Sequence, residues 1–258
     1  MGDREFTSDF YMIALKKLKS GVILYGRTKY DHDTGSMSFI KPRQVIQFNN
    51  LEFEEDSFII FIHEDYFHGN KLHSEINNYG YFDYEINEAL HLSPREEQIM
   101  WDLFYKIETE YHNNTDEYSR DIILTHIDSM LKYSQRFYKR QFINRAKLSG
   151  KTVSAFQEVM VRYFKEGHGL PTVSNLAAQL NISPRYLSDL LKQETGKTAI
   201  ENIHIYLINE AKNRLKTQEQ NISEIAYELG FENVPYFSRL FKKETGISPN
   251  QFKKQLTN

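Results

Sequence analysis

The chain has 258 residues, a length that allows two domains, each with a hydrophobic core of its own. It contains no cysteine, which excludes disulfides, thiolate metal sites and cysteine nucleophiles. No apolar run approaches the roughly 20 residues that cross a bilayer, and the charged N-terminus (MGDREFTSDF) lacks the apolar segment of a signal peptide. The sequence therefore predicts a cytoplasmic protein with no membrane association.

Charge is divided unevenly along the chain. Residues 1–150 contain 18 Lys and Arg against 24 Asp and Glu, a net charge of −6. Residues 151–258 contain 14 against 11, a net charge of +3, which is modest for a DNA-binding domain. If either part binds a polyanion, we expect it to be the second.

The first ninety residues contain short runs rich in aromatic and β-branched residues, separated by turn formers such as Lys41-Pro42 and Asn49-Asn50. This spacing is typical of an antiparallel sandwich or barrel, so residues 1–92 are predicted to be all-β. The predicted strands are Phe10–Leu15, Val22–Tyr25, Met37–Ile40, Gln44–Phe48 and Phe58–Ile62.

Residues 93–148 change to a helical pattern. Ser93-Pro94-Arg95-Glu96 supplies an N-cap serine, a proline at the first helical position and a glutamate placed for a capping box, so a helix is predicted to about Tyr111. His112-Asn113-Asn114-Thr115 ends it, and a second helix is predicted from Tyr118 to about Phe142. The two helices form an antiparallel hairpin whose apolar faces are core or partly a dimer surface. Arg145–Lys151 is expected to be an exposed linker, most flexible at Ser149-Gly150.

An internal repeat is the strongest feature of the sequence. VSNLAAQLNISPRYLSDLLKQETG begins at Val173 and ISEIAYELGFENVPYFSRLFKKETG begins at Ile222, at an offset of 49 before the turn and 50 after it. Each copy predicts a helix-turn-helix, over about residues 173–196 and 222–246. The uninterrupted segment from Ile200 to about Lys216 predicts a helix of roughly 25 Å at 1.5 Å per residue.

Both copies carry the same boundary signals. The turn contains Asn181 or Gly230, residue types that tolerate the left-handed conformation. A capping residue and a proline then begin the second helix, and a glycine ends it. These signals are Ser183-Pro184 and Gly196 in the first copy, and Asn233-Val234-Pro235 and Gly246 in the second.

A helical repeat of this kind can also serve protein contacts. Two units separated by a rigid helix favour DNA, because such a helix holds two recognition helices about 34 Å apart, one turn of B-DNA. A protein-binding repeat has no need of that separation.

The C-terminal part of the sequence resembles the AraC/XylS family of bacterial transcription activators. The second copy carries the pattern Ile225-Ala226, Gly230-Phe231, Tyr236-Phe237, Phe241-Lys242, Gly246 and Ser248-Pro249. The resemblance covers about Thr152 to Leu256, and residues 1–92 are similar to the cupin-type effector or dimerisation domain that often precedes it. It implies promoter or operator double-stranded DNA and RNA polymerase as partners, a small-molecule effector, a homodimer, and activation more often than repression.

The predicted fold class is α+β. A β-rich, cupin-like domain with a helical hairpin precedes an all-α domain of two helix-turn-helix units joined by a long helix. The predicted divisions are residues 1–92, 93–148 and 149–258. Tyr25, Phe39, Phe48 and Phe61 can line an effector pocket, although aromatic residues in a β domain are more often core.

Removing the apolar positions from each recognition helix leaves the residues expected to face DNA. By resemblance, the base-contacting positions of the first unit are Arg185, Ser188 and Asp189, although Arg185 and Asp189 are spaced i,i+4 and can pair with each other. The candidates in the second unit are Asn233, Val234, Ser238 and Arg239. The phosphate-contact candidates are Lys192, Gln193, Lys242 and Lys243. The alternative for each lysine is ordinary solvated surface.

The sequence predicts no enzyme and no cofactor. His63, His68 and His73 recur every five residues, which places them on neither one strand face nor one helix face, so surface or structural roles are expected. Phosphate-binding glycine loops, nucleophile elbows and H-E-x-x-H are absent from the sequence. The alternatives are a metal-dependent cupin enzyme with a DNA-binding tail and a helical protein-interaction adaptor.

Overall fold

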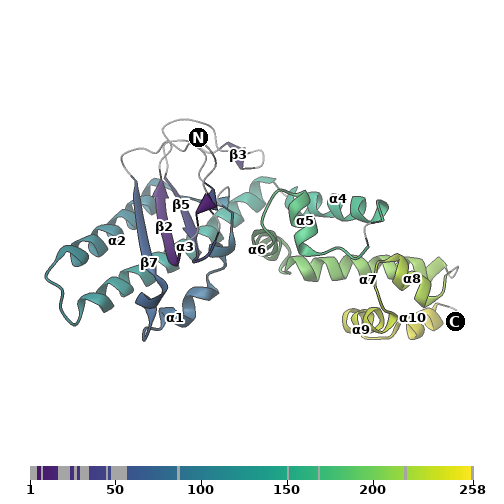
Figure 1. Cartoon of the computed structure of the whole chain (residues 1–258). Helices are drawn as coiled ribbons and strands as arrows, with labels where there is room; N and C mark the ends of the chain where they lie inside the picture. The colour runs from purple at the N-terminus through teal and green to yellow at the C-terminus, as the bar shows by residue number, and fades with distance from the viewer. Residues whose placement is uncertain are drawn as a thin grey trace. The chain divides into compact units, whose positions relative to one another are not determined.

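A computed structural model of the chain describes residues 5–6, 8–16, 24–25, 28–29, 35–44, 46–47, 57–85, 88–149, 151–167, 169–217 and 220–256. The chain divides into two compact units, Met1–Asn144 and Arg145–Asn258. The first combines a small sheet with helices and the second is helical (Figure 1), so the α+β fold class is confirmed. Within the described residues, no helix is both long and apolar enough to cross a membrane.

The strands of the first unit pair in an antiparallel fashion. The main sheet has four strands in the order β7-β2-β5-β8, with Ile13 of β2 opposite Phe39 on one side and Ile60 on the other. Two short ladders, β1-β6 and β3-β4, accompany it. The strands are β1 (Glu5–Phe6), β2 (Phe10–Lys16), β3 (Leu24–Tyr25), β4 (Thr28–Lys29), β5 (Ser36–Ile40), β6 (Ile46–Gln47), β7 (Phe58–His63) and β8 (Leu90–His91).

Three predicted strands match β2, β5 and β7 closely. The predicted runs Val22–Tyr25 and Gln44–Phe48 lie only partly within the described residues, where they contain β3 and β6. Of the aromatic residues expected in a core or pocket, Phe39 is buried and Phe61 is 57% exposed. The side chains of Tyr25 and Phe48 lie outside the described part of the chain.

Residues 64–83 contradict the all-β prediction for residues 1–92. They form a series of short helices: η1 (Glu64–Phe67), α1 (Leu72–Glu75), η2 (Ile76–Asn78) and η3 (Gly80–Asp83). Phe67, Leu72 and Ile76 are buried, one each in η1, α1 and η2. Their spacings of five and four residues do not distinguish a helix from a strand, so the sequence carried no periodic signal for helical structure here.

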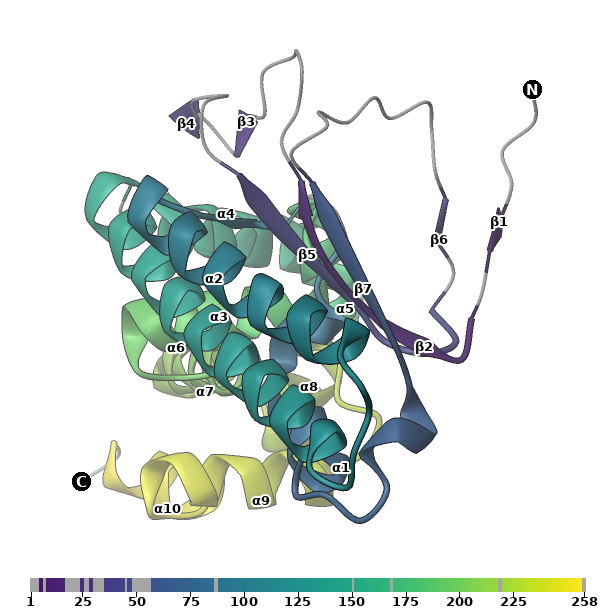
Figure 2. The same ribbon diagram turned by 90° about the vertical axis from the view of Figure 1, so that its left-hand side faces the viewer.

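A helical hairpin covers one face of the sheet (Figure 2). It consists of α2 (Pro94–His112) and α3 (Ser119–Ser149). The Phe58 ring of β7 stacks on Phe104 of α2 at a centroid distance of 4.4 Å, and Phe39 of β5 lies 6.2 Å from Tyr138 of α3. These aromatic contacts join the sheet to both helices.

The predicted start of the hairpin is confirmed and its predicted end is not. Ser93 and Glu96 form the capping box, with the Ser93 amide donating to the Glu96 carboxylate at 2.8 Å. The helix predicted to end near Phe142 continues to Ser149, so most of the predicted linker 145–151 is helical. Residues 143–149 contain neither proline nor glycine, and nothing in their sequence ends a helix.

The second unit is built from helices around one continuous core. The core contains Leu176 and Leu187 from the first copy of the repeat, Ile203 and Leu207 from the helix between the copies, and Phe237 from the second copy. The helices are α4 (Lys151–Lys165), α5 (Val173–Gln179), α6 (Pro184–Thr195), α7 (Ala199–Thr217), α8 (Ile222–Glu228), α9 (Val234–Thr245) and α10 (Pro249–Gln255).

Candidate nucleic-acid interface

The two copies of the repeat fold into helix-turn-helix units with the same turn. Asn181 has a φ of 54° and Gly230 a φ of 87°, so both are left-handed as predicted. In the first unit the Ile182 amide donates to the Ala177 carbonyl at 3.1 Å, and in the second the Phe231 amide donates to Ala226 at 3.0 Å. These six-to-one hydrogen bonds end both first helices in the same way.

The recognition helices α6 and α9 also begin and end alike. The Ser183 hydroxyl accepts a hydrogen bond from the Tyr186 amide at 3.2 Å, and the Asn233 side chain accepts one from the Tyr236 amide at 2.8 Å. A proline stands in the first turn of each helix, and left-handed Gly196 and Gly246 form the C-caps. The predicted boundaries of both helices are therefore confirmed.

Helix α7 packs against α6 on one side and against α8 and α9 on the other. Its 19 residues correspond to about 28 Å at 1.5 Å per residue. In Figure 1 both α6 and α9 are viewed nearly along their axes, so the axes of the two recognition helices have similar orientations. The expected separation of about 34 Å, one turn of B-DNA, stays a prediction.

The predicted contact residues of the first helix-turn-helix unit are only partly available to DNA. Arg185 is exposed, and its Nε lies 3.0 Å from the Asp189 carboxylate, the pairing that their spacing allows. The Ser188 hydroxyl accepts a hydrogen bond from the Ala199 amide at the start of α7, at 3.3 Å. Lys192 is exposed and Gln193 is half-buried. The ion pair and the contact with α7 use part of the polar surface of α6.

The second helix-turn-helix unit presents a more accessible basic surface than the first. Arg239, Lys242 and Lys243 are all exposed on α9. Asn233 is exposed, but its side-chain oxygen caps the helix. Val234 packs against the core and Ser238 is half-buried, so neither is as open as Arg239.

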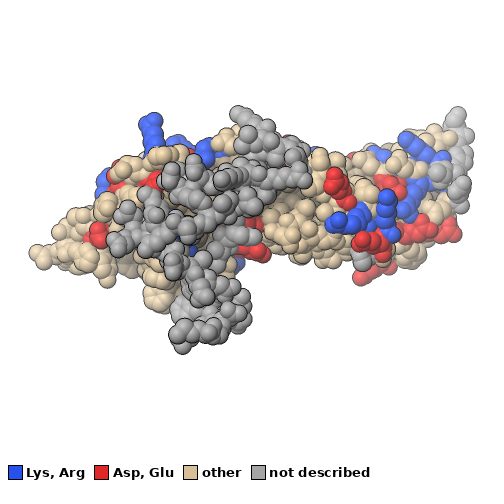
Figure 3. All heavy atoms as spheres, turned by 90° about the horizontal axis from the view of Figure 1, so that it is seen from above, with Lys and Arg blue, Asp and Glu red and all other residues tan. Residues whose placement is uncertain are grey.

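Figure 3 shows one face of the C-terminal unit, on which basic and acidic side chains are intermixed. A mixed surface of this kind attracts a polyanion less than the basic exposed residues of α9 do.

The turn of the second helix-turn-helix unit packs closely on the connection between α4 and α5, a contact that the sequence did not predict. An added Cβ at Gly230 would lie 2.2 Å from the Leu170 backbone nitrogen and 2.3 Å from the Gly169 carbonyl carbon. The connection between α4 and α5 thus lies directly on the turn between α8 and α9. Gly167 and Gly169, both left-handed, were the local signals of a special conformation in this connection.

The three histidines considered as possible metal ligands lie in the N-terminal unit of the chain, in the helical segment of residues 64–83 or just before it. His63 is half-buried, whereas His68 and His73 are exposed, with their rings 4.9 Å apart. Within the described ranges, no group of three His, Asp or Glu side chains is placed to hold a metal ion.

Comparisons with known proteins identify the helix-turn-helix units. A family model described as a helix-turn-helix domain matches residues 176–255. The uncharacterized HTH-type transcriptional regulator YfiF of Bacillus subtilis is 34% identical over 136 residues, which are 52% of this chain and 41% of that protein. The arabinose operon regulatory protein of Escherichia coli is 35% identical over 81 residues, which are 31% of this chain and 28% of that protein. The chain therefore spans less than half the length of these two relatives.

Among solved structures, the C-terminal domain of AraT, a response regulator from Geobacillus stearothermophilus, is 35% identical to this chain. The match covers 42% of this chain and 87% of that one, with a TM-score of 0.37. The helix-turn-helix model begins within α5 and ends with the last residue of α10, so it includes both units and the helix between them. Residues 176–255 therefore form a helix-turn-helix domain that is similar to part of the arabinose operon regulatory protein.

Proposed function

We propose that the protein is a sequence-specific, double-stranded DNA-binding transcription regulator that places α6 and α9 in successive segments of the major groove. The observation that carries this proposal is the tandem pair of units, with the same turn, caps and glycine C-caps, on either side of α7. A helix that begins with a capped first turn and exposes a basic face suits the major groove.

The two units are proposed to contribute unequally. Arg239 on α9 is exposed, whereas Arg185 on α6 is engaged with Asp189. An exposed i,i+4 ion pair is worth only a few tenths of a kcal/mol, so Arg185 can leave Asp189 for a guanine. The aspartate nevertheless leaves α6 with less net positive charge than α9, and we therefore expect α9 to dominate sequence reading.

Selection of bound fragments from a random pool of DNA duplexes tests the proposal. The expected result is a site with two conserved blocks whose centres lie about 10 base pairs apart, one helical turn. Selection of a single short block would show that only one unit reads DNA. Absence of any salt-dependent binding to duplexes would instead support the protein-interaction adaptor.

Substitution of Arg239 by alanine is expected to weaken binding to the selected site by about 1–3 kcal/mol and to relax preference at one base pair. Arg239 is exposed in the middle of α9, where its guanidinium can fork onto a guanine. Competition binding with single-base variants of the site measures the effect. A uniform loss across all variants would reassign Arg239 to the phosphate backbone.

Substitution of Lys243 by alanine is expected to weaken binding to all duplexes similarly and to lower the slope of log K against log salt by about 1. Lys243 is exposed near the C-terminal end of α9, away from the first turn. Salt titrations of wild-type and variant protein on the selected site and on a random duplex measure both quantities. An unchanged slope would mean that Lys243 is ordinary solvated surface.

The N-terminal unit of the chain, Met1–Asn144, is proposed to control the C-terminal unit, Arg145–Asn258. Its sheet and helical hairpin would sense a small molecule or a partner, and a homodimer formed through the helices of residues 94–142 would place four helix-turn-helix units on two half-sites. RNA polymerase as a partner, a cytoplasmic location and the cupin-type similarity of residues 1–92 belong to the same proposal. Sedimentation of the full chain as a monomer at all concentrations would remove the dimer from it.

A further inference from the structure

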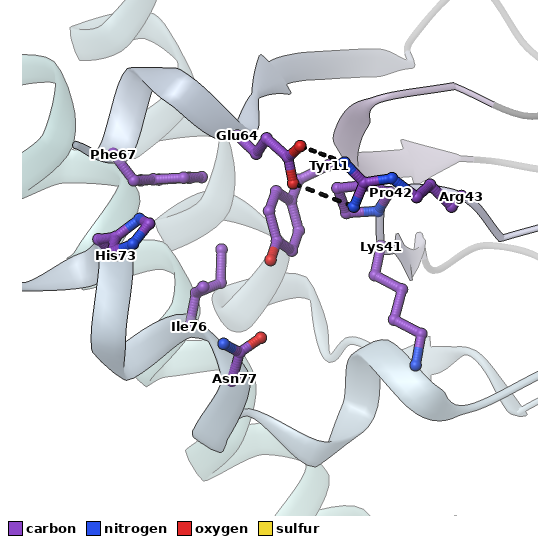
Figure 4. Close-up of a pocket in the computed structure, with 9 residues that line it drawn as sticks. All are labelled: Tyr11, Lys41, Pro42, Arg43, Glu64, Phe67, His73, Ile76 and Asn77. Carbon is purple, nitrogen blue, oxygen red and sulfur yellow. Dashed lines mark hydrogen bonds and ion pairs between the residues drawn. The ribbon is translucent and has the colours of Figure 1, made fainter.

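The first unit contains a cavity of about 300 Å³ at one end of its main sheet (Figure 4). The cavity lies between β2, the turn that follows β5, and the helical segment of residues 64–78. A volume of about 300 Å³ lies at the low end of the range of small-molecule pockets and suits a small metabolite. Its lining residues are Tyr11, Lys41, Pro42, Arg43, Glu64, Phe67, His73, Ile76 and Asn77.

Two ion pairs connect the turn after β5 to the helical segment beside the cavity. Arg43 pairs with Glu64, the first residue of η1, and a second guanidinium nitrogen donates to the same carboxylate at 3.3 Å. Lys41 pairs with Asp83, the last residue of η3. The cavity is therefore bordered by two cations, and each is held by a carboxylate on the helical segment.

Arg43 has an unusual backbone conformation. Its φ is 62°, in the left-handed region that residues other than glycine seldom occupy. Its amide donates to the Ser8 carbonyl at 2.8 Å, which fixes the turn. Non-glycine residues in this region are concentrated at ligand clamps and other functional sites, where the surrounding structure compensates for the strain. This conformation places the guanidinium beside the cavity.

Polar groups within the cavity complement these cations. Figure 4 shows the Tyr11 hydroxyl in the lining, near Ile76 and Asn77. The Tyr11 hydroxyl and the Asn77 amide both line the cavity, where they can form hydrogen bonds with a ligand. Burial, and then the Glu64 charge, raise the pKa of Tyr11, which keeps its hydroxyl protonated as a donor. Phe67 and Ile76, both buried, supply an apolar wall.

We propose that this cavity binds a small organic carboxylate, whose carboxyl group takes the place of Glu64 on the Arg43 guanidinium. The cavity would then be the effector site of the proposed regulator, and in this respect the inference rests on the proposed function. Hydroxyl or carbonyl groups of the ligand bind Tyr11 and Asn77, and its hydrocarbon part lies on Phe67 and Ile76. Release of Glu64 frees η1 from the turn after β5.

The exchange of partners is chemically reasonable. A guanidinium fork matches a carboxylate in two parallel hydrogen bonds, so a ligand carboxylate satisfies Arg43 as well as Glu64 does. Arg43 and Glu64 are both partly exposed, and ion pairs in contact with solvent contribute little to stability. Displacing Glu64 is therefore a small cost beside the contacts that the ligand gains.

The test measures binding to the full chain by isothermal titration calorimetry. The probe is 2-hydroxy-4-methylpentanoate, which carries a carboxylate, a hydroxyl and a branched apolar body. The matched neutral probe is its primary amide. We expect the carboxylate to bind and the amide to bind at least about tenfold more weakly, since it lacks the charge that Arg43 recognises. Inorganic phosphate, titrated in the same way, distinguishes a carboxylate site from a general oxyanion site.

Two substitutions should change the affinity in opposite directions. Arg43→Gln should weaken binding of the carboxylate about ten- to a hundredfold, because the guanidinium is lost. Glu64→Gln should strengthen it, because the carboxylate that binds both terminal nitrogens of Arg43 is lost while the side-chain volume stays the same; Asp9, 3.7 Å from the Arg43 Nε, remains. Lys106→Gln, on exposed α2 surface away from the cavity lining, is the matched control and should leave affinity unchanged.

The proposal is wrong if the probe and a set of other small carboxylates all fail to bind, if the amide binds as well as the acid, or if Glu64→Gln weakens binding as Arg43→Gln does. Tighter binding of phosphate than of the carboxylates would also overturn it. These titrations contain no DNA. A chain that binds the carboxylate without binding duplexes would keep this inference and contradict the proposed function, and the reverse result would do the opposite.

Discussion

Replacing Gly230 with alanine is expected to lower the free energy of unfolding of the second unit by about 4 kcal/mol, the sum of backbone strain and steric overlap. The φ of 87° is strained for any residue with a Cβ. The new methyl group would also lie 2.2 Å from the Leu170 nitrogen and 2.3 Å from the Gly169 carbonyl carbon. Both atoms belong to the backbone, so relief requires the whole α4–α5 connection to move.

Gly246→Ala separates the two causes. Gly246 has a φ of 82°, close to that of Gly230, but an added Cβ there meets no atom within 4 Å. Its substitution should cost only the backbone strain, about 1–2 kcal/mol. The difference between the two variants therefore measures the close packing of the α4–α5 connection on the turn of the second helix-turn-helix unit.

Hydrogen exchange resolved by segment measures this prediction, because α8 and α9 can be followed apart from the first unit. Exchange in α8 and α9 should accelerate far more in Gly230→Ala than in Gly246→Ala. Equal acceleration in the two variants would mean that residues 169–170 move aside freely. In that case the contact would have no part in fixing the second recognition helix relative to α5.

The helix-turn-helix units were predictable from sequence because their determinants are local. Each cap, turn residue and C-terminal glycine acts within a few residues of its own position, and the repeat shows the same pattern twice. Ser183 and Asn233, for example, cap α6 and α9 through hydrogen bonds to residues three positions further along the chain. Such signals do not depend on the tertiary fold.

The first unit was harder to predict because its determinants are dispersed. Residues 64–83 carry aromatic and aliphatic residues in a proportion that also suits strands, and the spacing of the buried Phe67, Leu72 and Ile76 does not distinguish the two structures. The cavity is more dispersed still. Its lining comes from residue 11, the turn at residues 41–43 and the segment from 64 to 77, which only the folded chain brings together.

Contacts between residues far apart in the sequence also decide which of the predicted DNA-contacting side chains are free to bind DNA. Helical periodicity places Ser188 and Arg239 on outward faces, and the spacing of Arg185 and Asp189 anticipates their ion pair. Periodicity cannot show that the Ser188 hydroxyl meets the start of α7, because the two lie on different helices. The sequence therefore identified the surface of each recognition helix better than it identified which side chains are free to use it.

His91 gives the first unit a sensitivity to acid that can be measured. It lies in β8, is buried, and its backbone carbonyl accepts a hydrogen bond from Arg140 at 2.6 Å. Burial, and then the nearby Arg140 charge, lower the pKa of His91 to about 4. Above the unfolded pKa of about 6.5 the imidazole is neutral in both states and does not affect stability. Below it, the unfolded chain takes up a proton that the folded chain refuses.

The first unit is therefore expected to lose about 3 kcal/mol of stability through His91 alone as the pH falls from about 6.5 to about 4. His91→Gln, which cannot titrate, should remove this part of the loss. His112→Gln, at the exposed end of α2, should not. Urea unfolding followed by Trp101 fluorescence reports on the first unit selectively, because Trp101 is the single tryptophan of the chain and packs on Phe58. The same pH dependence in wild type and His91→Gln would show that His91 accepts a proton in the folded protein as readily as in the unfolded chain.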